Sequence, residues 1–156
     1  MYGETAIRRA TIDDADRVGN IFLEARNAAM SYLPEVHTDD QVRSWIAGTV
    51  LTNEDVFVET DDGDPVGFVA LTESMLEHLY VQPRSWGHGS GSRLLEHAKQ
   101  QRPDGFTLWV FQRNERARSF YERRGLVLVR TTDGDGNEEG EPDALYERPG
   151  EIHASS

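Results

Sequence analysis

Three glycines at alternate positions, Gly87, Gly89 and Gly91, are the residues of this chain whose spacing most clearly points to chemistry. They follow an apolar run that Pro83 ends, and they precede a stretch at 92–101 with the apolar spacing of an amphipathic helix. No helix interior tolerates so many glycines, so they are predicted to form a loop that opens a helix. Backbone N–H groups at such a helix start favour phosphate, because the helix dipole is positive there. The loop therefore predicts a site for a phosphate-bearing cofactor.

Other residue types narrow the chemistry. The chain has no cysteine, which excludes a thiolate nucleophile, a disulfide framework and a Cys-based zinc site. His78, His88 and His97 do not have the spacing of zinc ligands, so we expect surface or hydrogen-bonded histidines and no metal. A mononucleotide-binding protein is a rival reading of the glycine loop. It is disfavoured because the loop lacks the Gly-Lys-Ser/Thr ending of a phosphate-binding loop.

The charge balance limits the partners. A net charge of −12 and a pI of about 4.7 argue against nucleic acid and against an anionic membrane surface. A cationic amine is compatible with this charge, although solubility explains the acidity equally well. No apolar run has the length of a membrane span, and the first residues lack the apolar core of a signal peptide, so a cytoplasmic location is expected.

The pattern along the chain predicts one mixed α/β domain over residues 1–148, with a flexible tail at 149–156. Thr11 and Thr38 look like N-caps, and Gln41 would complete a capping box with Thr38. The run FTLWVF reads as a buried strand, so Trp109 is expected in the core, as is Trp45. The predicted strands are 5–10, 55–60, 65–72, 76–81, 106–111, 126–131 and 144–148; the predicted helices are 11–27, one that starts after Thr38, 92–101 and 114–124.

Two segments together resemble a known family. VQPRSWGHGSGSRLL at 81–95 resembles the acetyl-CoA-binding loop and helix of the GCN5-related N-acetyltransferases (GNAT). NERARSFYERRGL at 114–126 is similar to the second signature of that family. The order of elements matches the family over about residues 5–148.

The resemblance implies a fold and an activity. The fold is a central, mostly antiparallel sheet that splays between its fourth and fifth strands, with helices on both faces. The activity is transfer of an acetyl group from acetyl-CoA directly to a primary amine of a small molecule or, as the second choice, of a protein. A catalytically silent acyl-CoA-binding or regulatory module with the same fold is the alternative. A homodimer is compatible with the family.

The resemblance also implies cofactor contacts. Pantetheine would lie in the gap beside the fourth strand and hydrogen-bond the backbone of Leu79 and Val81 like an added strand. Trp86 stands where a Gln or Arg is usual in the family, and Arg84 or His88 would supply positive charge instead. The residues expected to contact acetyl-CoA are Leu79, Tyr80, Val81, Trp86, Gly87, His88, Gly89, Ser90, Gly91, Ser92, Asn114 and Ala117.

Acetyl transfer needs a base and an acid. An alkyl amine with a pKa near 10 must lose a proton before it attacks a thioester. For the base we nominate Glu77, whose side chain is expected on the same face of the strand as those of Leu79 and Val81. An equal alternative is that Glu77 is only a solvated residue and that a water chain removes the proton. By resemblance, Tyr121 matches the family's frequent general acid, and a phenol is a suitable donor to the departing thiolate.

An acidic, glycine-rich segment at 133–143 allows two interpretations. Its composition favours a flexible, solvated hairpin connection. The functional alternative is a rim that attracts a cationic acceptor, in which Glu141 also takes part. The residues proposed for that acceptor site are Tyr32, His37, Glu138 and Glu139.

Overall fold

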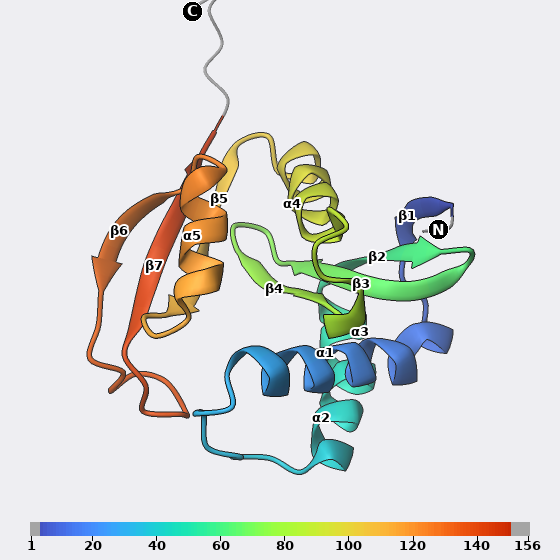
Figure 1. Ribbon diagram of the computed structural model, residues 1–156, viewed down its shortest axis with the longest axis horizontal. Helices are drawn as coiled ribbons and strands as arrows, with labels where there is room; N and C mark the ends of the chain where they lie inside the picture. Colours follow the sequence, from blue (N-terminus) through green and yellow to red (C-terminus); the bar gives the residue numbers. More distant parts are fainter. Residues whose placement is uncertain (1–3, 151–156) are drawn as a thin grey trace, which may run out of the picture.

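The computed structural model describes residues 4–150 and contains two antiparallel sheets (Figure 1). The first has the strand order β1-β2-β3-β4, a meander in which each neighbouring pair is antiparallel. The second has the order β5-β7-β6. The strands are β1 (Thr5–Arg9), β2 (Asp55–Asp61), β3 (Asp64–Leu71), β4 (Leu76–Val81), β5 (Gly105–Phe111), β6 (Val127–Thr131) and β7 (Asp143–Pro149).

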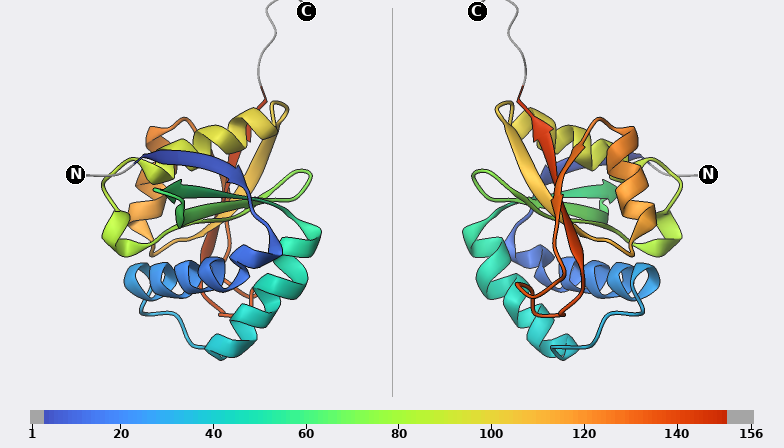
Figure 2. Two further views of the ribbon diagram at one scale, coloured as in Figure 1. Left: turned by 90° about the vertical axis from the view of Figure 1, so that its right-hand side faces the viewer. Right: turned by 90° about the vertical axis from the view of Figure 1, so that its left-hand side faces the viewer.

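Helices cover both faces of the first sheet (Figures 1 and 2). On one face, Val18 and Ile21 of α1 pack with Val58 of β2 in one core cluster. On the other face, Leu94 of α4 packs with Leu108 of β5 in a second cluster. The mixed α/β architecture is therefore confirmed. The helices are η1 (Ile12–Asp14), α1 (Ala15–Ala29), α2 (Asp39–Trp45), η2 (Ile46–Val50), α3 (Leu51–Asn53), η3 (Pro83–Ser85), α4 (Ser90–Gln101) and α5 (Glu115–Arg123).

The two sheets separate between β4 and β5, as predicted. The strands meet through one isolated parallel bridge, Met75 with Thr107, and the Thr107 N–H donates to the Ser74 carbonyl at 3.1 Å. Beyond this point β4 pairs only with β3, and β5 pairs only with β7. The edge of β4 that faces β5 is therefore left open to a ligand.

Capping residues mark the starts of two helices, α2 and α5. The Thr38 hydroxyl accepts the Gln41 N–H at 3.1 Å, and the Gln41 side chain accepts the Thr38 N–H at 2.9 Å, which is the predicted capping box. Asn114 caps α5 by accepting the Ala117 N–H at 3.2 Å. These caps fix where α2 and α5 begin, and α5 forms one wall of the site.

The prediction that Trp109 is a core residue is wrong. The strand FTLWVF alternates between buried and exposed positions, because only one face of the second sheet packs on the core. Trp109 is 39% exposed on the other face, with the Arg130 guanidinium 5.4 Å from its ring centroid. Trp45 is partly buried and meets the Phe22 ring edge-on at 5.6 Å, so it does belong to the core.

The predicted start of the C-terminal tail, residue 149, still belongs to a strand. Pro149 is part of β7, where it is the register partner of Gly105. The rest of that prediction, from 151 to 156, lies outside the described residues.

A buried histidine makes stability depend on pH. Burial lowers the pKa of His78 to about 4, because the ring sits among Phe22, Trp45 and Tyr80. The folded pKa lies below the unfolded value of about 6.5, so the folded state binds fewer protons and loses stability as pH falls through that window. We expect His78→Phe to match the wild type at pH 7.5 and to gain about 2 kcal/mol on it at pH 5. Urea unfolding at both pH values checks this, and a constant difference would contradict it.

None of the helices within residues 4–150 combines the length and the apolar character needed to cross a membrane.

Candidate active site

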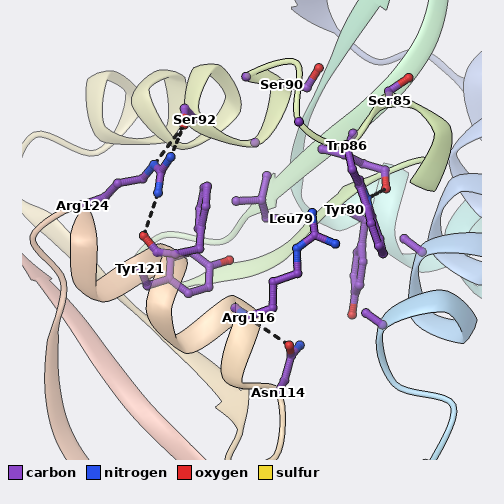
Figure 3. A pocket seen from close by; sticks show the side chains of 18 of the residues that line it. Leu79, Tyr80, Ser85, Trp86, Ser90, Ser92, Asn114, Arg116, Tyr121 and Arg124 are labelled. Carbon is purple, nitrogen blue, oxygen red and sulfur yellow. Dashed lines mark hydrogen bonds between the residues drawn. The ribbon is translucent and has the colours of Figure 1, made fainter.

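A cleft of about 430 Å³ occupies the gap that the splayed strands leave (Figure 3). Its walls are β4 with the loop that follows, the start of α4, the helix α5 and the end of α1. The lining residues are Ala25, Ala29, Met30, Leu79, Tyr80, Val81, Ser85, Trp86, Gly87, Gly89, Ser90, Gly91, Ser92, Asn114, Arg116, Ala117, Phe120, Tyr121, Arg123 and Arg124.

The open edge of β4 presents backbone groups to this cleft. The Gln82 N–H donates to the Val66 carbonyl at 2.8 Å, toward β3. Because backbone groups alternate along a strand, those of Leu79 and Val81 point the other way, toward the cleft. One of them is already engaged, since the Trp86 indole N–H donates to the Val81 carbonyl at 2.7 Å. An extended ligand with amide groups can therefore pair along Leu79.

The start of α4 suits phosphate. Gly89 is the N-cap with φ of 85°, and it offers no side chain to cap the first turn. The left-handed backbone conformation at Gly89 favours glycine, and a Cβ there would also lie 2.8 Å from Arg93 Nη1 and displace the end of that side chain. First-turn amides such as those of Gly91 and Ser92 have no carbonyl partner within the helix. The cleft thus fits a cofactor with phosphates at one end and an amide-bearing arm.

The buried carboxylate of Glu59 binds the first turn of α4. Glu59 of β2 is fully buried, and its Oε1 accepts Arg93 Nε at 2.6 Å. Its Oε2 accepts the Ser90 hydroxyl at 2.5 Å and Arg93 Nη2 at 3.1 Å. Ser90 is the first residue of α4, so the network fixes the helix start to the first sheet.

Two tyrosines, Tyr80 and Tyr121, line the cleft. Burial, and secondarily the neighbouring Tyr80, raises the pKa of Tyr121 above its usual value. Burial raises the pKa of Tyr80 to about 12, with smaller opposing effects of Arg26 and Glu139. No hydrogen bond found within residues 4–150 uses the Tyr121 hydroxyl. Tyr121 is therefore a neutral phenol whose O–H is available to a ligand.

Glu77 does not line the cleft. The register pairs Ala70 with His78 and Leu71 with Leu76, so Glu77 is the extra residue of a β-bulge. The choice of Glu77 as the base rests on the alternation of side chains between the two faces of a strand, and the bulge interrupts that alternation at Glu77. Its Oε2 accepts the Thr72 hydroxyl at 2.9 Å. Burial, and secondarily Glu77, raises the pKa of nearby Glu54 to about 7.

The acidic segment is tied to the rest of the chain. Glu139 pairs with Arg26 of α1 at 3.2 Å, and Glu138 meets His37 Nε2 at 3.1 Å. Glu141 pairs with Arg113 at 2.5 Å.

Arg113, the partner of Glu141, also contacts Tyr32. The Arg113 guanidinium lies 4.0 Å from the Tyr32 ring centroid, and the buried Tyr32 hydroxyl has no partner within the described residues. None of the four residues proposed for the acceptor lines the cleft. The segment at 133–143 forms a strap over the connection between α1 and α2 and is joined to α1 and to that connection by these contacts.

The glycine loop and the second signature come together as the resemblance implies. Every residue expected to contact acetyl-CoA lines the cleft except His88, which is exposed beside it. Sequence reasoning missed the α1 wall and the arginines of α5. A helical repeat counted from Asn114 through Tyr121 would have placed Arg124 on the same face. Its guanidinium bonds the Ser92 hydroxyl at 2.6 Å.

The described residues contain no cluster of three or more His, Asp or Glu side chains that could hold a metal ion.

Comparison with known proteins decides the family. Residues 52–126 match the model described as an acetyltransferase (GNAT) domain. An uncharacterized N-acetyltransferase from Archaeoglobus fulgidus is 30% identical over 136 residues, covering 77% of this chain and 91% of that protein. This chain belongs to the GCN5-related N-acetyltransferase family. It is therefore an enzyme that transfers an acetyl group from acetyl-CoA.

Two further proteins are similar to this chain, one in sequence and fold and the other in fold. The peptidyl-lysine N-acetyltransferase YjaB of Escherichia coli is 28% identical over 128 residues, covering 80% of this chain and 83% of that protein. Its apo solution structure superposes with a TM-score of 0.78 over 95% of this chain and 99% of that one. The Thermoplasma acidophilum PaiA N-acetyltransferase, solved with coenzyme A, is 18% identical and has a TM-score of 0.72 over 94% of this chain and 99% of that one, which supports the fold alone.

Proposed function

We propose that this N-acetyltransferase passes the acetyl group directly to a primary amine at the end of an aliphatic chain, with lysine side chains of proteins as the acceptor class. The cleft lining carries the proposal. Its α1 wall is apolar, formed by Ala25, Ala29 and Met30, and no Asp or Glu from the described part of the chain is among the lining residues. The apolar stem of lysine suits such a wall. A polyamine would bring further ammonium groups, which are costly to bury without carboxylates.

Two further observations favour lysine over the small-molecule acceptor expected from the sequence. Glu139 and Glu141 of the strap are each paired with an arginine of the same chain, and Glu138 contacts His37 Nε2, so these carboxylates are poorly placed to attract a further cation. The E. coli relative YjaB is named for peptidyl-lysine.

Separate groups of the cleft are assigned to the steps of acetyl transfer. Bound acetyl-CoA supplies an acyl thioester. The outward N–H of Leu79 can donate to the acyl oxygen, which stabilises developing negative charge. The Tyr121 hydroxyl holds a proton for the departing sulfur. Within residues 4–150 no carboxylate or imidazole lines the cleft, so the amine loses its proton to water.

A panel of acceptors tests this proposal. We expect kcat/KM, measured as release of free CoA, to be at least about tenfold higher for a lysine peptide than for a polyamine, because only the polyamine must desolvate extra charges. A simple aliphatic monoamine should fall between them.

The matched variant is Ala29→Asp, which puts a carboxylate into the apolar wall. It should raise the rate with the polyamine and lower the preference for the peptide. A wild-type preference for the polyamine would contradict the proposal.

A further inference from the structure

Trp86 links the two walls of the cleft. It lies in the loop between η3 and α4, where its indole N–H donates to the Val81 carbonyl at 2.7 Å. The guanidinium of Arg116, from α5 on the opposite wall, lies 3.8 Å from the Trp86 ring centroid. Figure 3 shows Arg116 extending from α5 across the cleft to the face of Trp86. The indole is thus fixed at one edge by β4 and covered on one face by a cation.

Among the described residues Arg116 makes no ion pair, a feature that it shares with Arg124 but not with Arg113. Arg113 is held by Glu141, and Arg124 bonds the Ser92 hydroxyl. None of the ion pairs found within residues 4–150 includes Arg116. In a chain with a net charge of −12, an anionic ligand is repelled overall, so an uncompensated cation at the mouth of its cleft has a large local effect.

The position of this cation suits a phosphate. A guanidinium binds phosphate oxygens through two parallel N–H bonds, and stacking on an aromatic face fixes the plane of the fork. An arginine that is already held in one orientation loses less side-chain entropy when the ligand binds. Both Arg116 and Trp86 line the cleft together with the N-terminal turn of α4.

We propose that Trp86 is a platform that holds Arg116 across the mouth of the cleft, where the guanidinium binds a phosphate of acetyl-CoA. By its resemblance to the family's loop, the chain has Trp86 where Gln or Arg is usual. The positive charge is then supplied from α5, and the loop supplies the aromatic surface that orients it. This assignment concerns the cofactor and is independent of the acceptor.

Calorimetric titration with CoA tests the platform. We expect Arg116→Met and Trp86→Ala each to weaken CoA binding about tenfold, through loss of a charge-assisted bond or of its orientation. The double variant should bind no more weakly than either single variant, because both changes remove one interaction. Trp86→Phe keeps the ring and should retain nearly the wild-type affinity.

Ligand fragments separate this role from a general effect on the fold. The KM for acetyl-pantetheine, which lacks phosphates, should not change in Arg116→Met. An equal loss for CoA and for 3′-dephospho-CoA assigns the pyrophosphate, and a smaller loss for 3′-dephospho-CoA assigns the 3′-phosphate. The matched control is Arg130→Met, which removes a cation from above Trp109 outside the cleft and should leave CoA binding unchanged.

Three outcomes would overturn the proposal. The first is a CoA affinity within about twofold of wild type in Arg116→Met, since a charge-assisted bond is worth more than that. The second is additive losses in the double variant, which would mean that the two residues act separately. The third is an equal loss with acetyl-pantetheine in Arg116→Met. Thermal unfolding of each variant identifies any that fail to fold, and Trp86→Phe then remains as the folded comparison for the ring.

Discussion

Replacing Tyr121 with phenylalanine is expected to lower kcat about 100-fold while leaving the KM for acetyl-CoA near the wild-type value, as befits the loss of a general acid. The substitution removes one hydroxyl from a side chain that is 8% exposed. The ring keeps its edge-on contact with Phe120 at 5.2 Å, and no protein group within residues 4–150 loses a hydrogen bond. Stability should therefore stay within about 0.5 kcal/mol of wild type.

The pH dependence follows from the direction of the Tyr121 shift. Its pKa is raised, so the phenol keeps its proton through the range in which an alkyl amine with a pKa near 10 becomes neutral. We expect the wild-type rate to rise with pH toward that value, without a falling limb from Tyr121. Stopped-time assays of CoA release between pH 6.5 and 9.5 measure this profile.

Two variants serve as controls for Tyr121. Tyr80→Phe removes the other phenol of the cleft and should reduce kcat far less, because Tyr80 is assigned no proton. Glu77→Gln should lower kcat/KM mainly at low pH if Glu77 ends the water chain, and a wild-type-like profile would remove it as the base. A Tyr121→Phe enzyme within about threefold of wild type would contradict the acid role.

Arg93→Met is expected to destabilise the fold by about 3 kcal/mol or more, because it leaves the fully buried Glu59 carboxylate without its cation. For a domain of this size that corresponds to a fall in Tm of roughly 10 °C. Thermal unfolding measures the change. CoA affinity should fall as well, since the same network fixes Ser90 at the start of α4.

Substitution of the partner carboxylate, Glu59, serves as the control. Glu59→Gln should cost less than Arg93→Met, since the Arg93 side chain is 40% exposed and can be solvated when its partner is neutral. The double variant Glu59→Gln/Arg93→Met should be more stable than Arg93→Met alone, because it no longer buries a charge while the amide oxygen still accepts from Ser90. An Arg93→Met protein within about 1 kcal/mol of wild type would show that the pair contributes little.

Sequence reasoning succeeded where short-range rules decide the structure. Pro83 and the glycines around Gly89 place the loop and the start of α4, and Thr38 with Gln41 places α2, since each depends only on residues a few positions apart. The two segments that line the cleft, the glycine loop and the second signature, were predictable for the same reason, because each is local.

The errors come from long-range packing. The alternation that selected Glu77 fails at a bulge, which depends on how β4 pairs with β3. Glu59 reads as an ordinary strand residue until α4 covers it and brings Arg93 to its carboxylate, 34 positions away. Glu139 bonds Arg26, 113 positions away in the sequence, so the contacts of this charged, glycine-rich segment could not be read from its composition.

The most direct measurement of the central claim is acceptor-dependent CoA release by the wild-type enzyme, run beside calorimetric binding of acetyl-CoA. We predict that acetyl-CoA binds and that free CoA appears only when a primary aliphatic amine is added, in equal amount to the acetylated product found by mass spectrometry. Tight binding of acetyl-CoA with no amine-dependent release would contradict this account and identify the chain as a silent acyl-CoA-binding module.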